Sequence, residues 1–205
     1  MTRIVDQHIQ AVEGSDTLLD QSLALVLIGN ISRNGQRFPT SLAADGRGFF
    51  QETFRRESYE EAGIEGPFVQ DCLSLSGEGV LRGIHLQWPR AQGKLVYVLS
   101  GEVRDVAVDL RSASPTFKRW IAHALSGATQ VYVPPGFGHG FLVTAGPALL
   151  AYKCTDTYAP GSELTVRWDD PDLAIDWGIG EPILSPRDAR APLLSGIPAE
   201  RLPTY

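Results

Sequence analysis

Two residues on strand-like segments, a histidine and a carboxylate, have the types needed for acid–base chemistry. His85 lies in residues 81–87 and Asp105 in residues 103–110, two segments with the β-branched or alternating character of strands. Because side chains alternate along a strand, Asp105 shares its face with apolar positions. A buried carboxylate is costly without a partner, and His85 is a candidate partner. Such a pair is either a satisfied core contact or a tuned base, and the residue types leave both open.

A second histidine, His139, sits in the turn Pro-Pro-Gly-Phe-Gly-His-Gly at residues 134–140. Its flanking glycines allow a ligand to approach the backbone closely. The turn is similar to half of the pattern of cupin barrels, Pro-x-Gly-x-x-His. The other half supplies His-x-His and a glutamate for a metal, whereas this chain has His85, Leu86 and Gln87. Two imidazoles without a third ligand make a poor transition-metal site, so we expect no metal.

The elements that must position these residues are short strands. From residue 77 onward, Gly, Pro, Ser and Asp clusters recur at regular intervals and separate strand-length runs. This spacing predicts an all-β fold, an antiparallel sandwich or barrel, with a few short helices such as residues 16–25 and 57–62. No β-α-β rhythm and no Gly-rich phosphate loop is visible, which argues against a Rossmann fold.

The composition describes one globular domain. The chain has 205 residues, 43% of them hydrophobic, and a net charge of -6. We expect a leader over residues 1–24 and a single domain over 25–205. The acidic balance argues against a sequence-independent nucleic-acid binder. Two separated cysteines indicate neither disulfides nor a thiolate zinc site, and no signal peptide or membrane span is visible, so we expect a cytoplasmic protein.

Several motifs follow one another in a fixed order over about residues 42 to 195. They include residues 45–52, 79–87, 91–96, 101–111, 135–141, 158–163 and 168–171. Their joint order and spacing resemble the dTDP-4-dehydrorhamnose 3,5-epimerase family. The resemblance implies a cupin-like β-barrel (jelly roll), a nucleotide-diphosphate sugar substrate and no cofactor. It also implies a homodimer in which an N-terminal strand joins the neighbour's sheet.

The chemistry of such an epimerase explains the residue types. Protons on C3 and C5 of a 4-keto sugar are α to the carbonyl, so removal of either proton gives an enolate. Reprotonation on the opposite face inverts the carbon, which requires a base, an acid and a cation near the enolate oxygen. The resemblance makes His85 the base, Tyr152 the acid and Lys94 the cation. Asp188 and Asp105 are its two candidate carboxylate partners for His85.

The resemblance also implies a substrate-binding set. Three arginines would bind the diphosphate and neighbouring groups, and Tyr158 would stack on the thymine. The full set is Arg47, Glu52, Gln70, Cys72, Arg82, Lys94, His139, Tyr158, Glu163 and Arg187. The chain departs from the family at Cys72, where asparagine is usual, at Arg187, where lysine is usual, and at Leu86, where an aromatic residue is usual.

One requirement conflicts with ideal strand geometry. Arg82 and His85 are three residues apart and would face opposite sides of a regular strand. We therefore expect a bulge near Gly83.

The function implied is inversion of C3 and C5 of dTDP-4-dehydro-6-deoxy-D-glucose to give dTDP-4-dehydro-L-rhamnose. The alternative within the family is an epimerase that inverts C3 alone, on a dTDP-, CDP- or GDP-linked 4-keto-6-deoxysugar. Two further hypotheses are a sugar-binding cupin without turnover and a metal-dependent cupin such as an isomerase or dioxygenase.

Overall fold

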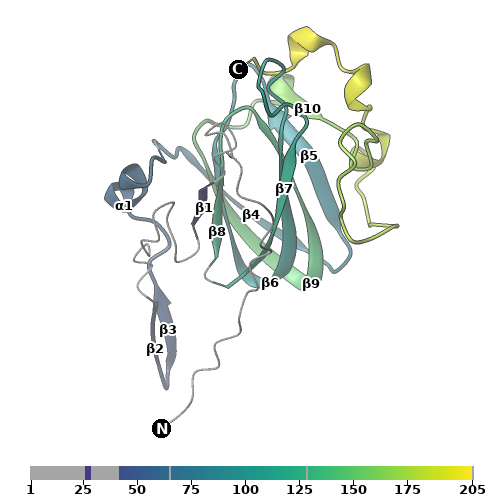
Figure 1. The fold of residues 1–205 in the computed structure, drawn as a ribbon. Coiled ribbons are helices and arrows are strands. Elements are labelled where there is room, and N and C mark those ends of the chain that lie inside the picture. Colours follow the sequence, from purple (N-terminus) through teal and green to yellow (C-terminus); the bar gives the residue numbers. More distant parts are fainter. Residues whose placement is uncertain (1–25, 29–41, 65, 128, 205) are drawn as a thin grey trace, which may run out of the picture.

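The computed structural model describes residues 26–28, 42–64, 66–127 and 129–204 (Figure 1). The expected leader and the helix expected over residues 16–25 lie outside the described residues. An eight-stranded antiparallel sheet forms the body, in the order β1-β8-β6-β9-β5-β10, with β4 paired to β9 and β7 to β6. The strands are β1 (Val26–Ile28), β4 (Gln70–Ser76), β5 (Leu81–Gln87), β6 (Lys94–Asp109), β7 (Trp120–Ser126), β8 (Gln130–Val133), β9 (Phe137–Cys154) and β10 (Glu163–Thr165).

The remaining elements are few and short. A hairpin of β2 (Leu42–Asp45) and β3 (Gly48–Gln51) precedes helix α1 (Arg56–Glu61). The other helical segments are 3-10 turns at Pro160–Ser162, Asp188–Arg190, Leu194–Gly196 and Ala199–Arg201. The prediction of an all-β fold with a few short helices is confirmed. Among the described residues, no helix has the length and apolar character needed to cross a membrane.

Two long strands form the middle of the sheet. β6 has 16 residues and β9 has 18, and the two are paired along most of their length. Each exchanges its second partner midway, because β6 pairs first with β8 and then with β7, while β9 pairs first with β5 and then with β4. Register shifts between Val98 and Val103 let both strands bend there. The result is a strongly curled sheet (Figure 1).

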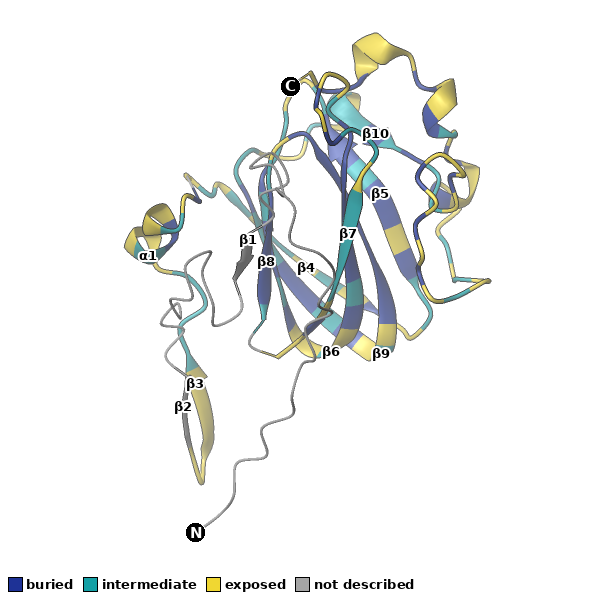
Figure 2. Cartoon of the chain, viewed as in Figure 1, coloured by how far each residue is buried: buried dark blue, intermediate teal, exposed yellow. Residues whose placement is uncertain are grey.

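Alternation along the strands separates the barrel interior from a covered outer face. Val103, Phe141 and Val143 belong to one buried cluster. Val106 and Val108 point the other way and pack against residues of the C-terminal segment such as Trp177 and Leu194, and the long strands are mostly buried (Figure 2). Burial on both faces explains why β6 has consecutive apolar residues at Val106, Ala107 and Val108, where a strand with one solvent-exposed face would alternate apolar and polar residues.

The bulge expected near Gly83 is present. The register between β5 and β9 shifts between Arg82 and His85, and Gly83 has φ +132. A Cβ on Gly83 would lie 2.5 Å from Gly140 Cα, and one on Gly140 would lie 2.9 Å from the Arg82 carbonyl oxygen. Both positions therefore require glycine. The irregularity allows Arg82 and His85 to reach the same side of the strand.

The β2–β3 hairpin projects away from the barrel (Figure 1). Phe49 and Phe50 on β3 are 71% and 70% exposed. On the barrel, the outer face of β4 presents Leu73 and Leu75, which are 68% and 66% exposed. Exposure of this extent is unusual for apolar side chains of this size, and it occurs on both surfaces.

Candidate active site

A cavity of about 500 Å³ opens into the barrel interior between β4, β5, β6 and β9. The apolar cluster around Phe141 and Leu150 lies next to it and contributes both of these residues to its wall. Most of the residues expected in the site line this cavity: Gln70, Cys72, Arg82, His85, Lys94, His139, Tyr152, Tyr158, Glu163 and Arg187. The other four, Arg47, Glu52, Asp105 and Asp188, do not line it.

Asp188 holds His85 from behind the cavity wall. His85 Nε2 lies 2.7 Å from Asp188 Oδ1, and the Asp188 side chain is only 3% exposed. Burial opposes ionisation of this carboxyl, but hydrogen bonds from His85 and Ser185 and the nearby Arg187 lower its pKa below the usual range. An ionised Asp188 accepts the Nε2 proton of His85, which leaves a lone pair on Nδ1. This is the arrangement of a base with a fixed tautomer.

Arg187 places a second charge beside the same imidazole. Its Nη2 lies 3.2 Å from His85 Nε2, and its Nη1 donates to Glu163 Oε2 at 2.6 Å. Because both Arg187 and the Nε2–H of His85 are donors, the 3.2 Å approach is a contact and not a hydrogen bond when Asp188 takes the proton. Arg187 thus provides a cation at the cavity wall, tied to Glu163.

Asp105 pairs with His139 and not with His85. His139 Nε2 lies 2.7 Å from Asp105 Oδ2, and both side chains are buried. The alternative that Asp105 holds His85 is therefore wrong. The reason is the strand order: β9 lies between β6 and β5, so His139 on β9 stands between Asp105 and His85.

Tyr152 faces the cavity from β9, directly opposite Cys72 on β4. Burial, together with a hydrogen bond to the Cys72 thiol, raises the pKa of Tyr152 to about 12. A phenol with such a pKa keeps its proton near neutral pH. It can therefore donate a proton to a carbanion that forms in the cavity, as a general acid does.

Lys94 supplies a cation at the start of β6. Burial lowers the pKa of its ammonium group, and Cys154, Glu163 and Asp105 oppose that shift. An ammonium in a poorly hydrated cavity stabilises a developing oxyanion more strongly than it would in water. Arg82, whose Nε donates to Ser76 Oγ at 3.0 Å, adds a further cation to the wall.

Arg47 and Glu52 lie at the hairpin and not at the cavity. Arg47 forms an ion pair with Asp45 at 2.5 Å beside the β2–β3 turn, and Glu52 pairs with Arg55 at 2.7 Å. Within one chain, neither residue belongs to the wall. The hairpin projects from the barrel, which explains why the chain's own cavity is out of their reach.

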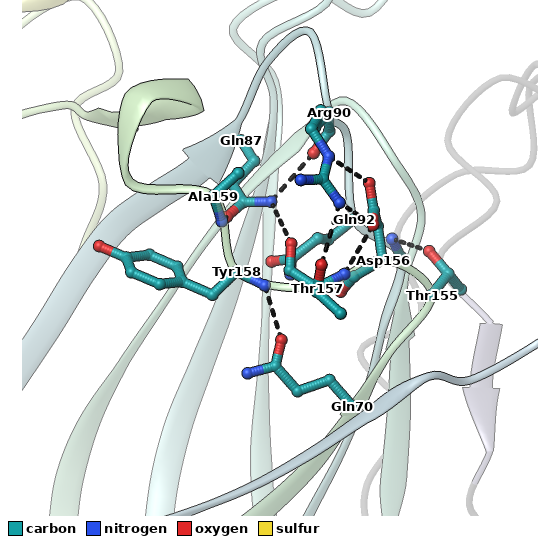
Figure 3. Close-up of polar contacts among 10 residues, drawn as sticks. Gln70, Gln87, Arg90, Gln92, Thr155, Asp156, Thr157, Tyr158 and Ala159 are labelled. Atoms are coloured by element: carbon teal, nitrogen blue, oxygen red, sulfur yellow. Dashed lines mark hydrogen bonds and ion pairs between the residues drawn. The ribbon is translucent and has the colours of Figure 1, made fainter.

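A polar network surrounds the mouth of the cavity, and of its members only Gln70 and Tyr158 were expected from the sequence. It joins the segment after β9 to the end of β5 and to the loop before β6 (Figure 3). Gln87 and Gln92 of this network line the cavity, as do the buried Cys154 and the half-buried Ser74. The one available signal was the position of Gln87, two residues after His85 on the same strand face. The network's other contacts join residues far apart in sequence and leave no local pattern.

No group of three or more His, Cys, Asp or Glu side chains in the described part of the chain is arranged to hold a metal ion. The cavity instead combines a carboxylate-held imidazole, a protonated phenol, an ammonium and two guanidinium groups. This set can remove a proton next to a carbonyl, stabilise the enolate, return a proton and bind an anionic substituent.

Comparisons with known proteins agree with this chemistry. The model of the dTDP-4-dehydrorhamnose 3,5-epimerase family matches residues 37–196. A curated relative of that name from Neisseria gonorrhoeae is 49% identical over 147 residues, which are 70% of this chain and 45% of the relative. This chain therefore spans less than half of that relative's length.

Two solved structures are similar in fold and sequence. A dTDP-6-deoxy-D-glucose-3,5-epimerase from Legionella pneumophila, in complex with dTDP-4-keto-L-rhamnose, is 54% identical with a TM-score of 0.78, and the match covers 81% of this chain and 90% of that one. A 3'-monoepimerase from Streptomyces bikiniensis, in complex with dTDP-quinovose, is 42% identical with a TM-score of 0.73, covering 80% and 86%. The cupin-like barrel, the match over residues 37–196 and these relatives show that the chain belongs to the dTDP-4-dehydrorhamnose 3,5-epimerase family.

Proposed function

We propose that this protein inverts C3 and C5 of dTDP-4-dehydro-6-deoxy-D-glucose and produces dTDP-4-dehydro-L-rhamnose. The observation that carries the proposal is the presence of the His85–Asp188 pair and the protonated Tyr152 in one cavity with Lys94. Proton transfer next to a carbonyl requires a base, an acid and an oxyanion partner, and these residues supply one of each.

In the proposed reaction, His85 removes the proton from C3, and the electron pair of the C–H bond moves to the C4 oxygen. Lys94 stabilises the resulting enolate, and Asp188 stabilises the imidazolium of His85. Tyr152 then donates its phenolic proton to C3 from the opposite face, which inverts the carbon. The same residues repeat the sequence at C5, and solvent restores the protonation states of His85 and Tyr152.

Cations and an exposed aromatic ring surround the rest of the cavity. We propose that Arg82 and Arg187 bind the diphosphate, since guanidinium groups pair with phosphate oxygens in a bidentate manner. Tyr158 lies at the cavity mouth with 51% of its surface exposed. Its hydroxyl donates to Glu163 Oε2 at 2.8 Å, so the ring is held in place as a platform for the thymine.

Inversion of C3 alone is the second candidate function. It is favoured by Cys72, because a thiol stands opposite Tyr152 at the position where the family usually has an asparagine. The similar structure with 42% identity is that of a 3'-monoepimerase, which supports this second candidate. The two free thiols, Cys72 and Cys154, suit a reducing compartment, and we propose that the enzyme works in the cytoplasm.

Solvent isotope exchange distinguishes these functions. With dTDP-4-dehydro-6-deoxy-D-glucose in deuterated water, we expect the enzyme to place deuterium at both C3 and C5, because each inverted carbon takes its new proton from solvent-exchanged groups. NMR and mass spectrometry of the product measure the label. Deuterium at C3 alone would identify the monoepimerase, and a protein that binds the nucleotide sugar but exchanges neither position would be a non-catalytic barrel.

We further propose that the protein is a homodimer in which the β2–β3 hairpin of one chain packs on the second chain. The exposed Phe49 and Phe50 on the hairpin and the exposed Leu73 and Leu75 on β4 are the surfaces that support this arrangement. β4 has only β9 as a partner among the described strands, so one of its edges is open. In such a dimer, the hairpin would bring Arg47 to the other chain's substrate.

Light scattering tests the dimer. We expect twice the mass of one chain for the wild-type protein, and a shift toward one chain for the double variant Phe49→Glu and Phe50→Glu, because two charges replace the apolar contact. The exposed Asp176→Ala, on the C-terminal side of the barrel, is the control and should leave the mass unchanged. A wild-type protein that is monomeric at micromolar concentration would eliminate the proposal.

A further inference from the structure

The backbone on both sides of Tyr158 is fixed by side chains from other strands. Residues 155–159 follow β9 and are called the Tyr158 loop here (Figure 3). Tyr158 N donates to Gln70 Oε1 at 2.7 Å, so β4 holds the loop from one side. The loop contains no helix or strand of its own, and these side-chain contacts take the place of a sheet ladder.

Gln87, the last residue of β5, contacts both neighbours of Tyr158. Its Oε1 accepts from Ala159 N at 2.7 Å, and its Nε2 donates to the Thr157 carbonyl at 3.3 Å. The same Nε2 donates to the Arg90 carbonyl at 3.0 Å. One carboxamide therefore satisfies a donor and an acceptor on either side of Tyr158 and also ties the loop to the segment before β6.

This carboxamide has few alternatives to these contacts. Gln87 is 5% exposed, so water competes weakly for its polar atoms. Its partners are one N–H and two carbonyls, which only an amide with its oxygen toward Ala159 can satisfy. Neither an apolar side chain nor a carboxylate of the same length makes all three bonds.

We propose that Gln87 is a positioning residue for the nucleotide, which acts through the backbone of the Tyr158 loop on the ring of Tyr158. The inference rests on the proposed function, in which that ring stacks on the base. The hydroxyl of Tyr158 is bound to Glu163, which Arg187 also contacts, so the ring is fixed at its far end as well. Loss of the Gln87 contacts frees only the backbone end of Tyr158. It therefore affects binding of the base more than proton transfer.

The first test measures ligand affinity in two variants. Gln87→Leu removes all three hydrogen bonds, and Gln87→Glu keeps the bond from Ala159 but places an anion against two carbonyls. Calorimetry with dTDP should show affinity reduced roughly tenfold in both variants, the size expected for losing an ordered base stack. In Gln87→Leu, which adds no charge to the cavity wall, affinity for inorganic pyrophosphate, which has no base, should stay within about twofold of wild type.

The second test is a double-mutant cycle with Tyr158→Ala. If Gln87 acts through Tyr158, Gln87→Leu should weaken dTDP binding no further in the Tyr158→Ala background. Turnover should show the same division, with KM raised and kcat within about twofold of wild type. Additive losses of affinity, equal losses for pyrophosphate or a fall in kcat at unchanged KM would each overturn the proposal.

Thr116→Val is the control for general loss of stability. Thr116 Oγ1 donates to the buried Asp109 at 2.6 Å, and neither residue lines the cavity. The variant loses a buried hydrogen bond as the Gln87 variants do, and it should bind dTDP as wild type does. Since the calorimetric measurements need no turnover, a wild-type protein that binds dTDP without epimerising the sugar contradicts the proposed function but leaves this inference testable.

Discussion

Replacing His85 with asparagine should lower kcat at least about 10³-fold, because the variant has no basic nitrogen to accept the C3 or C5 proton. The asparagine amide overlays only the near half of the imidazole and does not reach Asp188, but Arg187 remains beside that carboxylate, so the cavity wall should stay in place. Deuterium incorporation into the nucleotide sugar measures the effect. We expect both C3 and C5 to lose label, while dTDP affinity changes by less than about threefold.

His123→Asn is a matched control for this experiment. His123 is, like His85, a half-buried histidine; it lies on β7 and burial lowers its pKa, but it does not line the cavity. The control should exchange deuterium at the wild-type rate. Exchange in His85→Asn at the wild-type rate would mean that another group is the base. A loss confined to C5 would mean that two bases serve the two carbons.

Replacing Tyr152 with phenylalanine should separate exchange from inversion. Without the phenol, formation of the inverted product should fall by about 10²- to 10⁴-fold, the usual contribution of a positioned acid. His85 remains able to remove the proton and to return one to the same face. Its side chain is 22% exposed, so the imidazolium can trade its proton with solvent before that return. The variant should therefore place deuterium in the substrate without inverting C3, which NMR coupling constants reveal.

Tyr59→Phe provides the comparison for a buried tyrosine. Burial raises the pKa of Tyr59 to about 12, as it does for Tyr152, but Tyr59 contacts Gln130 and the Thr53 carbonyl, and none of these three residues lines the cavity. Inversion in this control should proceed as in the wild type. If Tyr152→Phe still inverts C3 efficiently, the acid is a different residue. If it also fails to exchange, Tyr152 takes part in proton removal.

The sequence was sufficient to predict the antiparallel strands of the barrel. Turn clusters at regular intervals and β-branched runs predict antiparallel strands, and these strands are present. The run Leu-Thr-Val-Arg-Trp at residues 164–168 also has the character of a strand, but β10 ends at Thr165. Beyond that point the chain forms turns at residues 168–169 and 171–173. It contributes Trp168 and Leu173 to the outer apolar cluster, so burial of large side chains there does not require a strand.

The site was predictable in type but not in pairing. The choice between Asp105 and Asp188 for His85 depends on strand order and on a contact across 103 residues, neither of which leaves a local pattern. The same holds for Gln87, whose partners Thr157 and Ala159 lie 70 and 72 residues away. Residue types suggest which chemistry is possible, whereas the fold decides which groups meet.

The contact between Gly83 and Gly140 has a consequence for changing this enzyme by directed evolution. The bulge at Gly83 places Arg82 and His85 on one side of β5, and any larger residue at either glycine would meet backbone atoms of the opposite strand. A second substitution cannot remove these backbone atoms. Neither glycine can therefore be replaced by a larger residue, alone or together with the other. A library aimed at new sugars should leave both glycines fixed and vary side chains of the cavity wall such as Cys72 and Ser74.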